Sequence, residues 1–244
     1  MVRGMLSVVL VVLLCVSLGA EDVSPLDRPI ADDFRIVNPS TLQPCAAGTV
    51  IDQIARKAHV LVGFENAPGC HPSPRATTRQ ERHRAPGDGE EVLNGITARQ
   101  AFDHVTAVMP TLTWQDMDGV AVIRPKDAWA DGTNPLNVSA APLGVVSSQK
   151  LGDIVDMLLR GTRPSMFVPH RDLPRSATSI DAPVSVTFSG GTLLEALNTL
   201  VRSRQGAEWQ FAYTGRGMGV LIVSTLDLSG GDVIAPVALP RTGQ

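Results

Sequence analysis

The chain lacks the long apolar runs, the excess of positive charge and the catalytic motifs that mark several large classes of protein. After its first twenty residues, no segment approaches the roughly 20 apolar residues that cross a bilayer as a helix. Arg3 is the only charged residue among the first twenty, and the rest of the chain has 20 basic and 24 acidic residues. Its net charge of −4 gives no overall basic surface for nucleic acid or anionic lipid. No Gly-x-Ser-x-Gly elbow is present, and the five histidines show no His-x-x-x-His spacing. We therefore expect that the protein is not an enzyme and that it holds no cofactor and no metal ion.

The first twenty residues have the pattern of a secretory signal peptide. Arg3 supplies the charged start, an apolar run extends from Leu6 to Cys15, and small residues stand at Gly19 and Ala20. A membrane anchor is the alternative, but the apolar run is short for one. Lipid attachment at Cys15 is a further alternative, although a bulky residue precedes that cysteine. We expect cleavage after residue 20 and a periplasmic or secreted mature protein.

Cleavage there would leave only two cysteines, Cys45 and Cys70. Cys45 precedes a predicted helix and Cys70 follows the strand after it, so a helix running out and a strand running back would bring the two close together. A disulfide bond between them fits an oxidising compartment. A free or metal-binding pair is the alternative, but a zinc site needs further ligands at characteristic spacing, and His71 alone does not supply them.

An internal repeat with an offset of 95 residues dominates the organisation of the chain. The segment 97–103 recurs as 192–198, and Trp114-Gln115 recurs as Trp209-Gln210. In both copies a Thr-x-x-Gln or Thr-x-x-Glu sequence predicts a capping box that starts a helix. An apolar stripe follows each cap and predicts a helix that buries one face, and a hairpin follows each helix.

Earlier in each copy, apolar residues at helical spacing predict helices over 50–58 and 151–159. Strands are expected after them, at 61–64 and 166–168. Asp52 and Asp153 hold similar places in the two helices, and we expect both to be solvated or near the helix start.

Before these helices, leading strands are expected at 34–37 and 136–138. A strand at 184–188 alternates apolar and polar residues, while its counterpart at 92–93 is weaker.

These elements predict an α+β fold of two tandem small domains, each with two helices packed between or against small mixed β-sheets. The first domain is expected over 30–129 and the second over 136–226. A turn-rich linker at 130–135 separates them, and 227–244 is expected to be an irregular tail.

The residues 96–123 and 184–223 resemble the secretin and TonB N-terminal short domain (STN domain). In that family a strand is followed by a helix beginning Thr-x-x-Glu-Ala-Leu and by a strand pair ending in a Gly-Val-Ile-Val-like run. The resemblance implies a periplasmic module of two helices between two small sheets that contacts partner proteins in secretion channels or relays signals from outer-membrane receptors. No catalytic residues carry over. The chain resembles two such modules in tandem, without a channel or barrel domain.

The clearest insertion is the polar segment 71–88. Four arginines in it are candidate contacts for an anionic polymer or for phosphate groups: Arg75, Arg79, Arg82 and Arg84. A solvated insertion is the simpler interpretation. His71 and His170 occupy similar places in the two copies, which indicates a shared loop geometry rather than a shared site.

Three glycines at 215, 217 and 219 suggest a phosphate-binding loop, but strands are predicted on both sides, so we interpret them as a turn.

The sequence thus predicts a non-enzymatic periplasmic or secreted protein-interaction module, accessory to a secretion or outer-membrane receptor system. It would bind a protein partner of the cell envelope through exposed sheet edges or the groove between the two units. The alternative is a small-ligand or polyanion binder that uses the arginine-rich loop 71–88.

Overall fold

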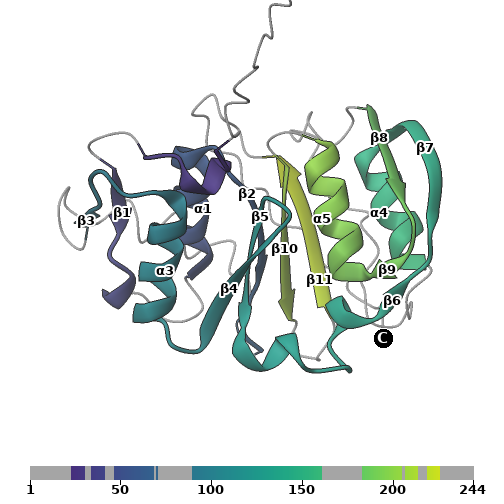
Figure 1. The fold of residues 1–244 in the computed structure, drawn as a ribbon. Coiled ribbons are helices and arrows are strands. Elements are labelled where there is room, and N and C mark those ends of the chain that lie inside the picture. Colours follow the sequence, from purple (N-terminus) through teal and green to yellow (C-terminus); the bar gives the residue numbers. More distant parts are fainter. Residues whose placement is uncertain are drawn as a thin grey trace, which may run out of the picture.

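The computed structural model describes residues 23–30, 34–41, 47–68, 70, 90–160, 183–204, 207–213 and 219–225 (Figure 1). These residues form the α+β fold that the sequence predicts, with helices packed against small mixed and antiparallel sheets. Among the described residues, no helix is long and apolar enough to cross a membrane.

The largest sheet has five strands in the order β11-β10-β2-β5-β4. β2 runs parallel to both β10 and β5, while the hairpins β4–β5 and β10–β11 are antiparallel. β10 and β11 belong to the second repeat and the other three strands to the first, so the two repeats share one sheet. The strands span Leu61–Glu65 (β2), Leu112–Met117 (β4), Val120–Pro125 (β5), Ala207–Tyr213 (β10) and Gly219–Thr225 (β11).

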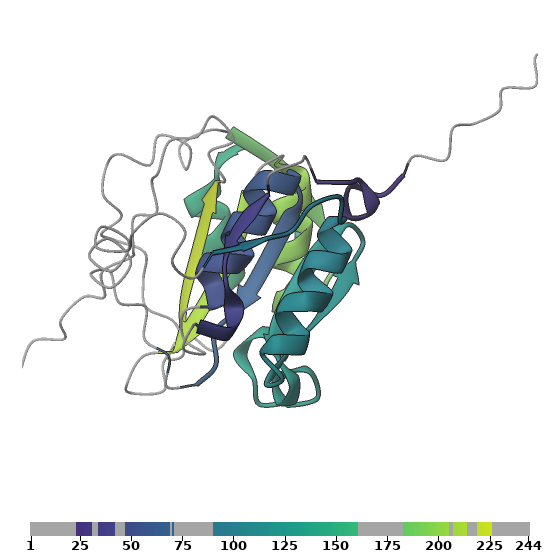
Figure 2. The same ribbon diagram turned by 90° about the vertical axis from the view of Figure 1, so that its left-hand side faces the viewer.

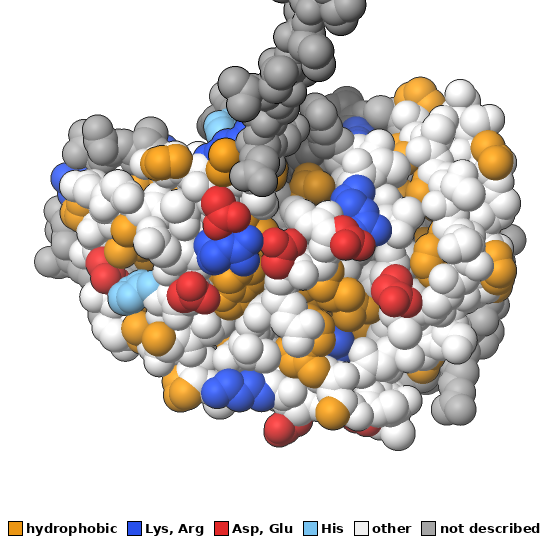
Figure 3. All heavy atoms as spheres, in the orientation of Figure 1, with side chains coloured by type: hydrophobic (Ala, Val, Ile, Leu, Met, Phe, Trp, Pro, Cys, Tyr) orange, Lys and Arg blue, Asp and Glu red, His pale blue; other side chains and the backbone are white. Residues whose placement is uncertain are grey.

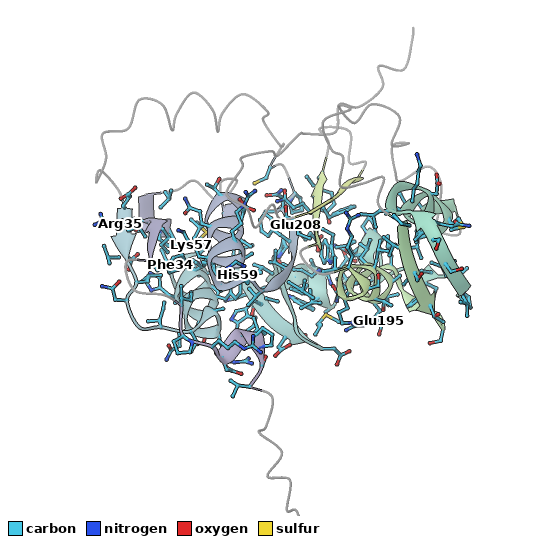
Figure 4. The ribbon with its side chains drawn as sticks, turned by 90° about the horizontal axis from the view of Figure 1, so that it is seen from above. Phe34, Arg35, Lys57, His59, Glu195 and Glu208 are labelled. Carbon is cyan, nitrogen blue, oxygen red and sulfur yellow. The ribbon has the colours of Figure 1, made fainter. Side chains whose placement is uncertain are left out.

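Helices of the two repeats cover opposite faces of this central sheet (Figures 1 and 2). α1 (Ala47–Ala58) and α3 (Ala98–Val108) lie on one face, whereas α4 (Leu151–Arg160) and α5 (Leu193–Ser203) lie on the other. Seen from above, Phe34 and His59 lie with the helices of the first repeat, and Glu195 lies on α5 across the central strands (Figure 4).

A two-stranded antiparallel sheet covers the outer side of each helix pair. β1 (Arg35–Val37) pairs with β3 (Glu90–Val92) in the first repeat, and β7 (Leu143–Lys150) pairs with β8 (Pro183–Phe188) in the second. The molecule therefore has five layers in the order sheet, helices, central sheet, helices, sheet (Figure 1). Shorter elements connect these layers: η1 (Pro25–Asp27), η2 (Pro39–Thr41), η4 (Lys126–Trp129), η5 (Pro135–Asn137), β6 (Ser139–Ala140) and β9 (Gly191–Thr192).

The central sheet serves two apolar cores because successive side chains of a strand point to opposite faces. On β5, Ala121 and Ile123 join the core around α1 and α3, whereas Val120 and Val122 join the core around α4 and α5. All four side chains are buried. Gly63 of β2 lies directly beneath the Trp209 ring, which a Cβ at that position would overlap. The backbone of the first repeat thus forms part of the core of the second.

The repeated caps are confirmed. Thr97 accepts a hydrogen bond from the backbone N–H of Gln100, and the Gln100 side chain accepts one from the backbone N–H of Thr97. Thr192 and Glu195 make the same reciprocal pair at the start of α5. The predicted helix and strand positions at 50–58, 61–64, 151–159 and 184–188 are also confirmed.

Two sequence predictions are wrong. Asp52 is buried rather than solvated, since Arg56 one turn later donates to both of its carboxylate oxygens at 2.9 and 3.0 Å. The segment 136–138 is not a strand, because Asn134 caps η5 through its side chain and Pro135 starts that helix. The leading strand of the second repeat is β7, whose largely exposed residues lack the apolar alternation that would have identified it.

Several predictions fall on residues outside the described part of the chain. They are the signal peptide 1–20, the strand 166–168, the tail 227–244, His71 and His170, and the glycines 215 and 217 of the second turn. The proposed division into domains at 130–135 stays a prediction.

Candidate interaction edge between the two repeats

β4 is an outer strand of the central sheet and lies between α3 of the first repeat and α5 of the second (Figure 1). Within the described residues, its strand partner is β5 alone. The register with β5 is continuous from Leu112 to Met117, with no bulge. β4 therefore presents a regular edge of the kind to which an extended segment can add.

The turn after β4 fixes the direction of its backbone groups. Asp118 and Gly119 have φ values of 53° and 84°, which is the type I′ turn expected of a two-residue hairpin. Such a turn is closed by a hydrogen-bonded pair, here Met117 and Val120, so the backbone N–H and C=O groups of Met117 face β5. By alternation, those of Trp114 and Asp116 face away from the sheet.

The α3 side of this edge carries a network of charged side chains around Trp114. Arg99 donates to Asp27 at 2.7 Å and to Asp116 at 3.1 Å, and its guanidinium lies 5.5 Å from the centre of the Trp114 ring. The Trp114 indole N–H donates to Asp103 at 2.8 Å. The hydrogen bond from Arg99 lowers the pKa of Asp27 from its usual value. This network therefore has three carboxylates and one guanidinium.

At the turn end of β4, the contacts from α5 are an amide and one matched ion pair. Met117 is partly buried against the second core, and its sulfur lies 3.4 Å from the Asn198 amide nitrogen. Arg202 donates to the Met117 carbonyl at 3.3 Å and to Asp118 at 3.1 Å. On the face that carries α3, β4 and α5, Figure 3 shows acidic and basic side chains in contact, with apolar surface between them.

The outer strand β7 differs from β4 in its regularity. Its register against β8 shifts twice, between Leu143 and Val146 and again between Val146 and Gln149. Ser148 has a φ of 55°, a conformation that an L-residue rarely adopts in a strand. Among the large apolar side chains of the described residues, Val145 is the most exposed, at 84%. Bulges twist an edge away from further pairing, so β7 is a poor template for strand addition despite its exposure.

A buried polar cluster lies at the carboxyl ends of β2 and β5. Arg124 and Glu65 form an ion pair of 2.5 Å in which both side chains are fully buried. The remaining Arg124 donors reach Asn134 and Asn137 at 3.1 and 3.0 Å and the Ala128 carbonyl at 3.2 Å. Because a buried charge is tolerated only when its hydrogen bonds are made, this arrangement has the character of a structural clamp.

The second repeat contributes Tyr213 to the same cluster. Its hydroxyl donates to Glu65 at 2.5 Å and accepts from Asn134 at 3.0 Å, while Asn134 donates to Glu65 at 2.6 Å. Burial and the hydrogen bond to Glu65 raise the pKa of Tyr213 above its ordinary value. Trp129 stacks on the Arg124 guanidinium at 5.0 Å. The cluster thus ties together the first repeat, the linker and the second repeat.

Most of the site residues predicted from the sequence lie outside the described part of the chain. Arg75, Arg79, Arg82 and Arg84 lie outside the described residues, and so does Cys45. Cys70 is described and buried, at 4% exposure. The predicted Cys45–Cys70 disulfide therefore stays a prediction. In the described ranges, no three His, Cys, Asp or Glu side chains come together as a metal site.

Sequence reasoning anticipated exposed edges and a groove between the units, but not which edge or which residues. The Asp118-Gly119 pair after Trp114 was an available signal for a tight regular hairpin. Glu65 and Arg124, a charged residue in each of two apolar strands, were an available signal for a buried pair. Comparisons with protein-family models, with curated proteins and with solved structures found no match.

Proposed function

We propose that this chain is a non-enzymatic protein-interaction module that binds an extended segment of a partner protein along the open edge of β4. The proposal places it in the periplasm or outside the cell, as an accessory to a secretion or outer-membrane receptor system. The signal-like first twenty residues and the resemblance to the STN domain support that setting.

The observation that carries the proposal is the regular outer strand between two helices that belong to different repeats. Trp114 and Asp116 direct two N–H and two C=O groups outward, and an added strand would pair with them. Each such bond contributes about 0.5–1.5 kcal/mol net, whereas a micromolar complex needs about 8 kcal/mol. Side chains along the groove must therefore supply much of the affinity, and α3 and α5 place them on both sides of the strand.

The buried clamp supports the same proposal, because a binding edge gains affinity when it is already in its bound geometry. Arg124 and Glu65 fix the ends of β5 and β2, and Tyr213 fixes β10 to them. The clamp thus holds strands of the two repeats together, so the two units need not come together on binding.

A pair of substitutions at Asp116 tests the edge. Asp116→Pro and Asp116→Ala both remove the carboxylate, but only proline also removes the outward N–H. Proline is tolerated at such a position because that N–H faces away from the sheet. A photoreactive side chain at the exposed Gln115 would report the partner in the cells that make the protein, and one at Val145 on the bulged edge is the control.

We expect one specific protein to cross-link through position 115 and not through position 145. Asp116→Ala should retain the cross-link and Asp116→Pro should lose it, with both variants as cooperatively folded as the parent by thermal unfolding. If cross-linking is equal in the two folded variants, or if position 145 captures the same protein as efficiently, the β4 edge is not the binding site.

A further inference from the structure

We infer that the segment bound at β4 carries basic side chains at alternate positions facing α3, and neutral or apolar side chains at the positions between them facing α5. This inference rests on the proposed function and specifies the chemistry of the partner. It follows from the alternation of the strand and from the unequal charge of the side chains that α3 and α5 place on its two sides, called here the α3 wall and the α5 wall.

The alternation is visible in β4 itself. Leu112, Trp114 and Asp116 face the core and charged network of α3, whereas Met117 faces α5. A strand added beside β4 continues the same pleat, so its side chains alternate between the same two walls. Every second residue of the partner therefore meets the α3 wall.

The α3 wall is acidic. The α3 wall here means four side chains, the carboxylates of Asp27, Asp103 and Asp116 and the guanidinium of Arg99, which already bonds two of them. The third, Asp103, accepts from the neutral Trp114 indole, a bond that leaves its negative charge uncompensated. The wall thus has a net charge of −2, and basic side chains of a bound strand would balance it.

The α5 contacts at the Met117 end of the edge have no such excess. Arg202 is matched by Asp118, and between them lie Met117 and the Asn198 amide. A partly buried methionine sulfur beside a neutral amide favours an apolar or neutral side chain. The two walls therefore specify different residues at neighbouring positions of one segment.

A second copy of this chain fits the edge poorly. Pairing β4 with β4 would bring the Asp103 and Asp116 carboxylates of both copies to one narrow strip, and like charges opposite each other in a sheet are destabilising. The charge pattern thus favours a different, basic segment. A concentration-dependent dimer that Asp116→Pro dissociates would overturn this choice of occupant.

Three capped peptides with a terminal fluorophore test the inference: Lys-Val-Lys-Val-Lys-Val, Thr-Val-Thr-Val-Thr-Val and Glu-Val-Glu-Val-Glu-Val. Fluorescence anisotropy would measure their binding to the mature protein at low and high salt. The double variant Asp103→Asn with Asp116→Asn removes two negative charges. It keeps a side-chain oxygen at position 103 for the Trp114 indole and one at position 116 for the backbone N–H of Gly119. Asp127→Asn with Glu90→Gln makes the same change in net charge outside the Arg99 network and is the matched control.

We expect the lysine peptide to bind at least about tenfold more tightly than the threonine peptide at low salt, and the glutamate peptide to bind most weakly. The double variant at 103 and 116 should weaken lysine-peptide binding about fivefold, because each exposed charge contributes modestly. The control variant should change the affinity for the lysine peptide less than about twofold. High salt should reduce all these differences in affinity.

The outcomes separate the inference from the proposed function. If lysine and threonine peptides bind equally and Asp116→Pro abolishes both, the edge binds strands and the charge preference is wrong. The inference also fails if the segment that cross-links through position 115 lacks alternating basic residues. If no peptide binds and position 115 captures no protein, the proposed function itself fails.

Discussion

Tyr213 shows how one residue reports on the contact between the repeats. It is the only tyrosine of the chain, and its hydroxyl bonds to Glu65 of the first repeat. Burial and this bond stabilise the neutral phenol, since an ionised phenolate would lie beside a carboxylate. The raised pKa of Tyr213 therefore depends on the intact contact with Glu65.

This raised pKa predicts a loss of stability in alkali. The folded state holds the proton more tightly than the unfolded state, so the contribution of Tyr213 is fully present below about pH 10, the ordinary tyrosine pKa. Above that pH the free energy of unfolding should fall by up to about 1.4 kcal/mol per pH unit from this group. Absorbance at 295 nm should show tyrosinate in the native protein only at higher pH than in urea.

Tyr213→Phe is the control for this prediction. It should flatten the alkaline loss of stability relative to the parent, although lysines also titrate there. At neutral pH it should cost about 1–1.5 kcal/mol, because Glu65 loses one of its donors. A native-state tyrosine titration that coincides with the titration in urea would contradict the raised pKa.

Residues whose role is local were predictable from the sequence, and residues whose role depends on distant strands were not. Thr97 and Thr192 act on amides three residues away, so the motif alone identifies them. The motifs did not predict two equivalent contacts. The Trp114 indole donates to Asp103, and the Trp209 indole donates to Asn198. Both donor and acceptor of the second contact lie 95 residues after those of the first. Glu65 and Asn134 meet only because β2 and the linker come together in space.

Among the elements, the buried ion pair between β2 and β5 is the contact whose disruption should be most costly. Glu65 and Arg124 are fully buried, and removing one partner leaves the other as an uncompensated charge. A buried pair as a whole can be replaced at far lower cost than one of its members.

Arg124→Met should accordingly lower the free energy of unfolding by about 3–5 kcal/mol, measured in urea. Adding Glu65→Gln to it should recover part of that loss, because the remaining amide is neutral. Arg35→Met makes the same substitution in an exposed pair, where Arg35 and Glu90 are 3.6 Å apart, and should cost less than about 1 kcal/mol. Equal losses for Arg124→Met and Arg35→Met would show that the buried clamp is not stabilising.

Elements with a strong periodic pattern were predictable, and those without one were missed. β8 alternates buried and exposed residues along its whole length, and the sequence identified it. β7, its partner, is mostly exposed and bulged twice, so no apolar alternation remained to be recognised. The bulges of β7 thus both interrupt the alternation of its side chains and make its edge unsuitable for strand addition.

At the scale of the whole molecule, the repeats are joined more closely than the sequence indicated. A repeat in the sequence shows that a unit recurs, but not which strands of the two units pair. Here β10 of the second repeat pairs with β2 of the first, and β5 supplies side chains to both cores. The β4 edge thus contacts α3 of the first repeat and α5 of the second, an arrangement that exists only when the two repeats are assembled.

This shared sheet predicts that neither repeat is stable alone. In a fragment of residues 21–130, the edge of β2 would be open, and Val120 and Val122 would lose their cover. Burying such a side chain contributes about 1.5–3 kcal/mol, and a domain has only about 5–15 kcal/mol in total. We expect fragments 21–130 and 131–244 each to lack cooperative unfolding and native near-ultraviolet circular dichroism. Mixing them should restore both signals and yield a one-to-one complex by sedimentation. If the first fragment alone is monomeric and unfolds cooperatively, the two repeats are independent domains, and the sheet contact between β2 and β10 is a docking contact rather than a condition of folding.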